Sequence, residues 1–131
     1  MSERTSSVEQ KPSTTTVLGP RARLIEDEQV HGALEYLRKS AHTLGKARER
    51  AKLAEHLIKH TEALQFKLST ATTADGKKAD ARTSDRFVAA IHEDAIATGE
   101  LAKLYALREA ASAILESWRT QEATLRQATR L

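Results

Sequence analysis

The feature that most constrains the fold is the stretch from Leu101 to Ala128, which contains no proline or glycine. Its mostly apolar side chains are spaced alternately three and four residues apart, which places them on one narrow line of an α-helix. They are Leu104, Leu107, Ala111, Ile114, Trp118, Gln121, Leu125 and Ala128. A line with this period must be covered by another helix, so the stretch predicts helix-on-helix packing, within the chain or between copies.

An earlier stretch of the chain predicts a second long helix. Glu26, Asp27 and Glu28 suit a helix start, where negative charge complements the helix dipole. The same alternating spacing then runs through Val30, Leu34, Leu37, Ala41 and Leu44. Continued further, it would meet Arg48 and Glu55, so we expect the apolar stripe to shift in register after Leu44. The shifted stripe comprises Ala47, Ala51, Ala54, Ile58, Thr61, Leu64 and Leu68.

The residues between the two helical stretches, 69–83, are polar and lack apolar periodicity, and Asp75-Gly76 is a turn signal. We interpret them as the loop of a hairpin, with Thr83, Ser84 and Asp85 as N-cap candidates for the following helix. The predicted fold is all-α: helices 27–68 and 84–128 in a coiled-coil-like antiparallel hairpin domain, 26–131. Because two helices leave much of each other uncovered, we expect a homo-oligomer.

Residues 1–25 differ from the rest in composition. They are rich in Ser and Thr, contain both prolines, Pro12 and Pro20, and offer little apolar surface, so we predict a disordered tail. A short linear motif for a partner is the alternative interpretation. No stretch of the sequence is apolar enough for a signal peptide or a membrane-spanning helix, and cysteine is absent. We therefore expect a cytoplasmic protein that makes no membrane contact.

The positive charge of the chain is concentrated in its first helix. The chain has 21 basic and 18 acidic residues, a net charge of +3 and a pI near 9.3. The candidates for binding a nucleic-acid backbone or an acidic protein partner are Arg38, Lys39, Lys46, Arg50 and Lys52. The plainer interpretation is a solvated lysine-rich face, because no aromatic residues interleave with these cations and no known nucleic-acid-binding motif is present.

The sequence offers no catalytic constellation. His56 and His60 have a spacing that can hold a metal, but the Glu of an HExxH site is missing and Lys59 would repel a cation. The consecutive residues His92, Glu93 and Asp94 point in different directions on a helix and cannot converge on one atom. We therefore expect a protein without catalytic residues, bound metal or cofactor.

A further set of residues is predicted to pack the hairpin or form its interface with a partner. Trp118 is expected to anchor the helix ends in the core, with a partner hot spot as the alternative. Tyr36, Trp118 and Arg119 would together organise the open end of the hairpin. The full set is Tyr36, Leu104, Leu107, Ile114, Trp118, Arg119 and Leu125.

Two blocks of the chain, 33–60 and 107–128, resemble a family of small all-helical proteins encoded by tailed bacteriophages and prophages. The first block carries the resemblance through Ala33, Tyr36, Leu37, Arg38 and Ala41. The second carries it through Ala111, Leu115, Glu116, Trp118, Arg119, Thr120, Gln121 and Ala123, with Leu115 where the family commonly has Ile. Trp118 to Gln121 form its most specific part, and the tail and loop do not match.

The resemblance implies a phage protein from an early gene cluster that also encodes recombination and replication functions. It implies an accessory role and supplies no catalytic residues. Our sequence-based hypothesis is a non-enzymatic accessory factor that assists DNA recombination or replication through the basic helix face. The alternative is a protein–protein interaction module, such as a host-factor inhibitor or an assembly protein, that does not contact nucleic acid.

Overall fold

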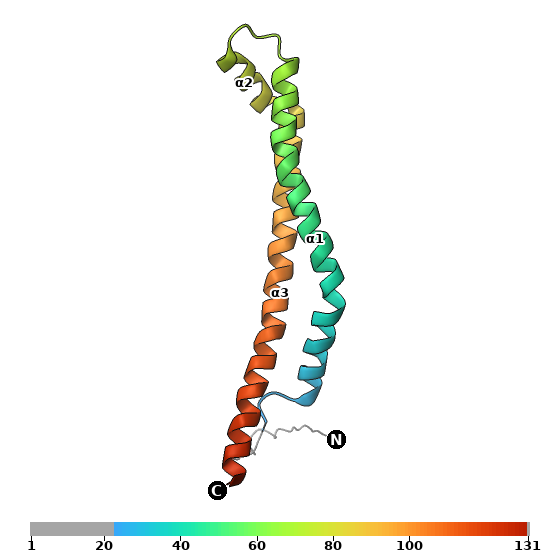
Figure 1. Cartoon of the computed structure of the whole chain (residues 1–131), viewed down its shortest axis with the longest axis vertical. Coiled ribbons are helices and arrows are strands. Elements are labelled where there is room, and N and C mark those ends of the chain that lie inside the picture. Colours follow the sequence, from blue (N-terminus) through green and yellow to red (C-terminus); the bar gives the residue numbers. More distant parts are fainter. Residues whose placement is uncertain (1–22, 131) are drawn as a thin grey trace, which may run out of the picture.

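The computed structural model describes residues 23–130, and in this range the protein is a long rod of helices (Figure 1). Helix α1 (Asp27–Leu68) and helix α3 (Asp85–Arg130) pack antiparallel, and the short helix α2 (Ala74–Thr83) connects them. The predicted all-α hairpin is confirmed, and both long helices begin within one residue of the expected positions. Among the described residues, no helix has the length and apolar character needed to cross a membrane.

The start of α1 is set by local polar contacts. The Glu26 backbone N–H donates to the side-chain oxygen of Gln29 at 2.8 Å, which closes one half of a capping box. Asp27 and Glu28 occupy the first turn, where their negative charge interacts favourably with the positive end of the helix dipole. The acidic cluster therefore marks the helix start, as its sequence pattern indicated.

The prediction that residues 69–83 form a loop is wrong, because most of them belong to α2. Thr73 caps this helix, with its Oγ1 accepting from the Gly76 N–H at 3.0 Å. Gly76 therefore lies in a first helical turn, where an added Cβ would come within 3.0 Å of Ala71 Cβ and Thr73 Oγ1. The sequence concealed α2 because it buries only Ala81 and so shows no apolar periodicity.

Ser84 lies between α2 and α3, at the end of the rod where the chain turns back, which we call the closed end. Its backbone N–H donates to the Ala81 carbonyl at the end of α2, and its Oγ accepts from the Phe87 N–H at 3.2 Å in the first turn of α3. One residue thus ends one helix and caps the next. This confirms Ser84 among the three N-cap candidates.

The contact between α1 and α3 follows one unbroken heptad pattern, which we call the seam. Its α1 residues are Val30, Ala33, Leu37, Ser40, Leu44, Ala47, Ala51, Ala54, Ile58, Thr61 and Gln65, all buried or half-buried. Its α3 residues are Phe87, Ala90, Asp94, Ala97, Leu101, Leu104, Arg108, Ala111, Leu115, Trp118, Glu122 and Leu125, likewise. The steps alternate between three and four throughout, as in a coiled coil.

The expected shift in register after Leu44 is therefore wrong. The seam steps from Val30 to Ala33, which is 5% exposed, and leaves Leu34 53% exposed beside it. From Ala33 the same spacing passes through Ser40 and Ala47, so it never meets Arg48 and needs no shift. The line predicted on α3 is likewise only partly in the seam: Leu107 lies beside it and is 47% exposed.

Polar contacts along the rod fix how the two long helices align. Gln121 bonds to Ile25, Arg108 to Ser40, and Arg50 to Glu100. As the residue number rises from Ile25 to Arg50, the number of its partner on α3 falls from 121 to 100. The helices keep one register over their full length.

Side-chain size in the seam varies along the rod. Small buried residues occur toward both ends: Ala33 and Ala111 toward the termini are 5% and 7% exposed, and Ala54 and Ala97 toward the closed end are 3% and 1% exposed. Small residues at these positions let the two helix backbones approach closely.

The seam also contains polar residues, and two of them, Arg108 and Ser40, bond to each other across it. Arg108 Nη1 donates to the Ser40 hydroxyl at 2.6 Å and to the Leu37 carbonyl at 2.8 Å, and Ser40 is only 7% exposed. A polar contact at a single seam position fixes register, because a slipped alignment would leave these groups unpaired.

We expect Arg108→Ala to lower the free energy of unfolding by about 1.5–3 kcal/mol, because the buried Ser40 hydroxyl loses its charged partner. Combining Ser40→Ala with Arg108→Leu should cost less than Arg108→Ala alone, because both polar groups are then removed together. Urea denaturation followed by circular dichroism measures both losses. A double variant that loses more than Arg108→Ala would contradict the assigned pairing.

Candidate interaction surfaces

Arg50, one of the cations predicted to bind a nucleic-acid backbone or an acidic partner, bonds to the other long helix of the hairpin. Its guanidinium donates to Glu93 at 2.7 and 2.9 Å and to Glu100 at 2.7 Å, and both carboxylates belong to α3. Hydrogen bonding to Glu93 is the main reason that the pKa of Arg50 is raised above its ordinary value. Arg50 therefore bridges the two long helices at the edge of the seam.

Arg38 and Lys39, on the outer side of α1, share one carboxylate. Glu35 accepts from Arg38 at 2.7 Å, and Lys39 Nζ lies 3.3 Å from the same oxygen. The hydrogen bond from Lys39, followed by that from Arg38, lowers the pKa of Glu35 below its ordinary value. The two ion pairs of Glu35 therefore stabilise the folded state at neutral pH, and this contribution disappears as the pH falls through the lowered pKa of Glu35. It is small because the group is exposed.

The remaining two basic candidates also have carboxylates nearby. Lys46 Nζ lies 3.9 Å from Glu49, and Lys52 Nζ lies 3.7 Å from Glu55. Both pairs have the i,i+3 spacing that joins neighbouring residues on a helix surface, so the sequence already contained this signal. All five predicted cations therefore lie beside acidic side chains, which a tally of net charge does not reveal.

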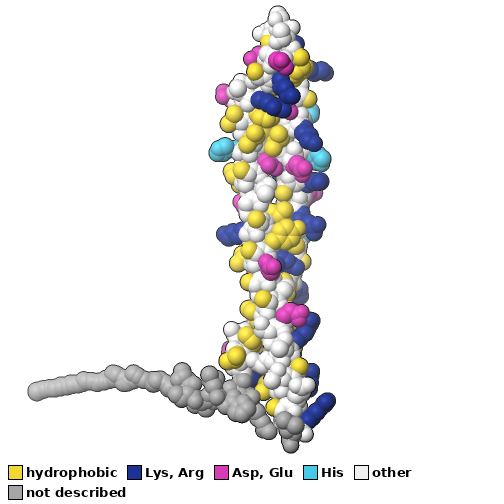
Figure 2. Space-filling view, turned by 90° about the vertical axis from the view of Figure 1, so that its left-hand side faces the viewer, with side chains coloured by type: hydrophobic (Ala, Val, Ile, Leu, Met, Phe, Trp, Pro, Cys, Tyr) yellow, Lys and Arg dark blue, Asp and Glu magenta, His cyan; other side chains and the backbone are white. Residues whose placement is uncertain are grey.

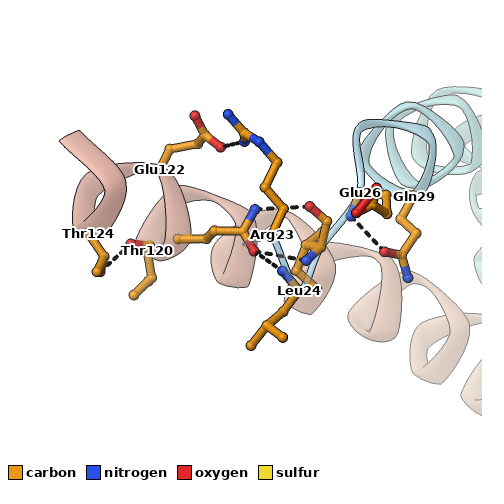
Figure 3. Close-up of polar contacts among 9 residues, drawn as sticks. Arg23, Leu24, Glu26, Gln29, Thr120, Glu122 and Thr124 are labelled. Carbon is orange, nitrogen blue, oxygen red and sulfur yellow. Dashed lines mark hydrogen bonds and ion pairs between the residues drawn. The ribbon is translucent and has the colours of Figure 1, made fainter. Parts of the chain in front are cut away.

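At the open end, Gln121 binds the segment that precedes α1. Its Oε1 accepts from the backbone N–H groups of Leu24 at 2.7 Å and Ile25 at 2.8 Å, and its Nε2 donates to the Ile25 carbonyl at 2.9 Å. Arg23 forms an ion pair with Glu122 (Figure 3). Residues 23–25, predicted as the end of a disordered tail, are thus bound to α3. The rest of that prediction, residues 1–22, lies outside the described residues.

We expect Gln121→Ala to raise the rate of tryptic cleavage after Arg23 about tenfold, because it removes three hydrogen bonds that hold residues 24 and 25. Cleavage at this bond is followed by mass spectrometry under native conditions. Gln127→Ala, at an exposed position on the same helix, is the matched control and should cleave like the unaltered chain. Equal rates in all three proteins would show that Gln121 does not hold the segment.

Of the residues predicted to organise the open end, two are packed and one is not. Tyr36 and Trp118 are half-buried, and neither the Tyr36 hydroxyl nor Trp118 Nε1 has a hydrogen-bond partner among the described residues. Arg119 is exposed and lies 3.4 Å from Glu116 on its own helix. Leu104 and Leu125 lie in the seam, whereas Leu107 and Ile114 flank it. Trp118 thus lies in the seam, whereas Arg119 lies on the exposed surface of α3.

An apolar groove of about 340 Å³ runs beside the seam near the open end. Its walls come from both long helices, with Gly32 and Tyr36 on α1 facing Leu107, Ala110 and Ile114 on α3. The groove is shallow and holds almost no polar surface, so it suits an apolar side chain from another helix.

Other apolar side chains remain exposed along the rod. Figure 2 shows them on one face as separate clusters, with acidic and basic side chains between them. Leu53, Leu57 and Leu64 on α1 are 58%, 41% and 40% exposed, and Ile96 on α3 is 49% exposed. The seam therefore covers only part of the apolar surface of each long helix.

The structure brings no metal-binding constellation together in residues 23–130. His56 and His60 lie on the exposed outer side of α1, and no group of three potential metal ligands forms in this range.

Comparison with protein-family models, curated proteins and solved structures finds no match to this chain. The resemblance to phage-encoded helical proteins stays a prediction.

Proposed function

We propose that this protein is a non-catalytic helical rod that binds other protein chains along its uncovered helix faces. The observation that carries the proposal is the local pairing of its cations. Each basic residue singled out for phosphate binding lies beside a carboxylate, while large apolar side chains remain exposed. A rod of this kind would suit the accessory role that the resemblance to phage proteins predicts.

Phosphate binding is disfavoured by the way these charges are arranged. A nucleic acid gains affinity when cations neutralise its phosphates and release counterions. On the outer side of α1, Glu35, Glu49 and Glu55 accompany the cations, and each would bring negative charge close to a bound phosphate. Recruiting Arg50 would in addition break its bonds to α3.

Protein binding is favoured by the apolar surface. Large exposed apolar side chains that lie in line on a helix are typical of protein contact sites. Leu53, Leu57 and Leu64 are spaced four and seven residues apart, so they lie on one side of α1.

The experiment is a gel-shift series with single-stranded and duplex DNA at about 50 and about 200 mM salt. We expect no shift at either ionic strength. The control variant is Lys46→Glu combined with Lys52→Glu, because these two cations contact only α1 in the described structure. Arg50 is left unaltered to preserve the hairpin. A shift at low salt that weakens at high salt and disappears in the variant would overturn the proposal in favour of nucleic-acid binding.

A further inference from the structure

We infer that the partner of one face is a second copy of this chain, which completes a four-helix bundle with both closed ends at the same end. This inference rests on the proposed function and names the partner. The face in question, called the flank, lies on the Arg50 side of the seam. Its residues are Gly32, Tyr36, Lys39, Lys46, Arg50, Leu53 and Leu57 on α1 and Ala89, Glu93, Ile96, Glu100, Lys103, Leu107, Ala110 and Ile114 on α3.

Among the described residues, no other element packs on the flank between Gly32 and Leu57. The helix α2 packs on the opposite side of α1, where Arg82 bonds to Glu62 at 2.6 Å and a pocket involves Phe66. From Gly32 to Leu57 the flank is about 38 Å long, and two helices make it roughly 20 Å wide. In projection this is close to the ~800 Å² per partner that a stable dimer buries.

Charge determines how a second copy can be placed on the flank. On the flank, α1 carries Lys39, Lys46 and Arg50, whereas α3 carries Glu93, Glu100 and Lys103, so α1 is strongly basic there and α3 is net acidic. A twofold axis along the rod lays the basic α1 of each copy on the net acidic α3 of the other, with Lys46 of one copy between Glu100 and Lys103 of the other. A twofold axis across the rod would instead lay the basic line of α1 on itself, which costs free energy.

The same placement matches large side chains with small ones. In the register fixed by the Arg108–Ser40 contact, Gly32 lies within about one helical turn of the level of Ile114, and Tyr36 within about one turn of Ala110, and all four line the same groove. Ile114 of each copy would enter the apolar groove of the other beside Gly32. A Cβ on Gly32 would meet nothing within 4 Å, so nothing in the described chain requires glycine there, although it costs about 1 kcal/mol in a helix interior.

Because the chain has no cysteine, cross-linking between single-cysteine variants tests the placement directly. Lys46→Cys and Glu100→Cys are made in separate chains, mixed and oxidised. We expect disulfide-linked heterodimers in the mixture and few linked dimers of either variant alone. The matched control is Ala41→Cys mixed with Tyr105→Cys. These two exposed positions lie at similar levels of the rod, on the side of the seam opposite to the flank, and should not cross-link. Equal linking of both mixtures, or efficient linking of Lys46→Cys alone, would overturn the inference.

Sedimentation equilibrium of the full chain supplies the second measurement. We expect a dimer whose Kd rises about tenfold with Lys46→Glu and is unchanged by Lys52→Glu, an equivalent lysine with its own i,i+3 carboxylate but outside the flank. A monomer at about 100 µM would overturn the inference. If that monomer also fails to shift DNA, the proposed function stands without this partner, whereas salt-sensitive DNA binding would remove the proposed function itself.

Discussion

Replacing Ala33 with Asp should lower the free energy of unfolding by about 3 kcal/mol or more, because it places an unpaired charge in the seam. Ala33 is 5% exposed and faces α3, whereas its neighbour Leu34 is 53% exposed. Leu34→Asp should therefore cost less than about 1 kcal/mol, although it removes a much larger apolar side chain. Hydrophobicity alone predicts the opposite order.

Urea denaturation followed by circular dichroism measures both variants under identical conditions. Ala33→Ser, which buries a hydroxyl instead of a charge, gives a measurable intermediate if the Asp variant does not fold. A loss at Leu34 equal to or greater than the loss at Ala33 would mean that Leu34, and not Ala33, belongs to the seam.

Trp118→Ala should be the next most damaging change, with an expected loss of about 2–4 kcal/mol, because a large, half-buried ring is removed from the seam. Trp118→Phe should stay within about 1 kcal/mol of the unaltered chain, since it keeps most of the ring and removes an Nε1 that has no partner among the described residues. The same urea titration measures both.

Arg119→Ala is the control for Trp118, because this neighbouring side chain is exposed and paired only with Glu116 on its own helix. It should change stability little. If Trp118→Ala were as mild as Arg119→Ala, Trp118 would not be a packing residue, and its alternative role as a partner hot spot would be favoured.

The sequence predicted the fold class and the helix starts because these depend on local chemistry. The acidic residues 26–28 and the hydroxyl of Ser84 satisfy the free N–H groups of helix termini or complement their dipoles, whatever lies opposite. The heptad spacing likewise required a covering helix. Both features are visible in one stretch of chain without knowledge of its neighbours.

The register could not be predicted because it depends on pairing between distant residues. Leu34 and Ala41 are more apolar than their neighbours Ala33 and Ser40, so hydrophobicity selected the wrong line. The actual seam accepts Ser40 because Arg108, 68 residues away, bonds to it. No pattern within one helix reveals that contact.

The candidate site shows the same division between local and distant information. The carboxylates beside Lys46 and Lys52 are three residues away and visible in the sequence. The partners of Arg50 belong to α3, so the sequence of α1 alone indicates a cation free to bind a nucleic-acid backbone or an acidic partner and does not reveal these contacts. Gln121 was placed in an apolar line because its backbone partners at residues 24 and 25 are 97 and 96 positions away.

The most direct test of the central claim, that α1 and α3 pair in one fixed antiparallel register, is a set of spin-label distances. One label is placed at His42 and the second at Ala89, Lys103 or Ser117, positions 14 residues or about 21 Å apart along α3. The doubly labelled chains are diluted with unlabelled chain, so that only distances within one chain are measured. Because Ser40 bonds to Arg108 and Arg50 to Glu100, the shortest distance is predicted for His42 with Lys103. A shortest distance at Ala89 or Ser117 would contradict the register and the seam built on it.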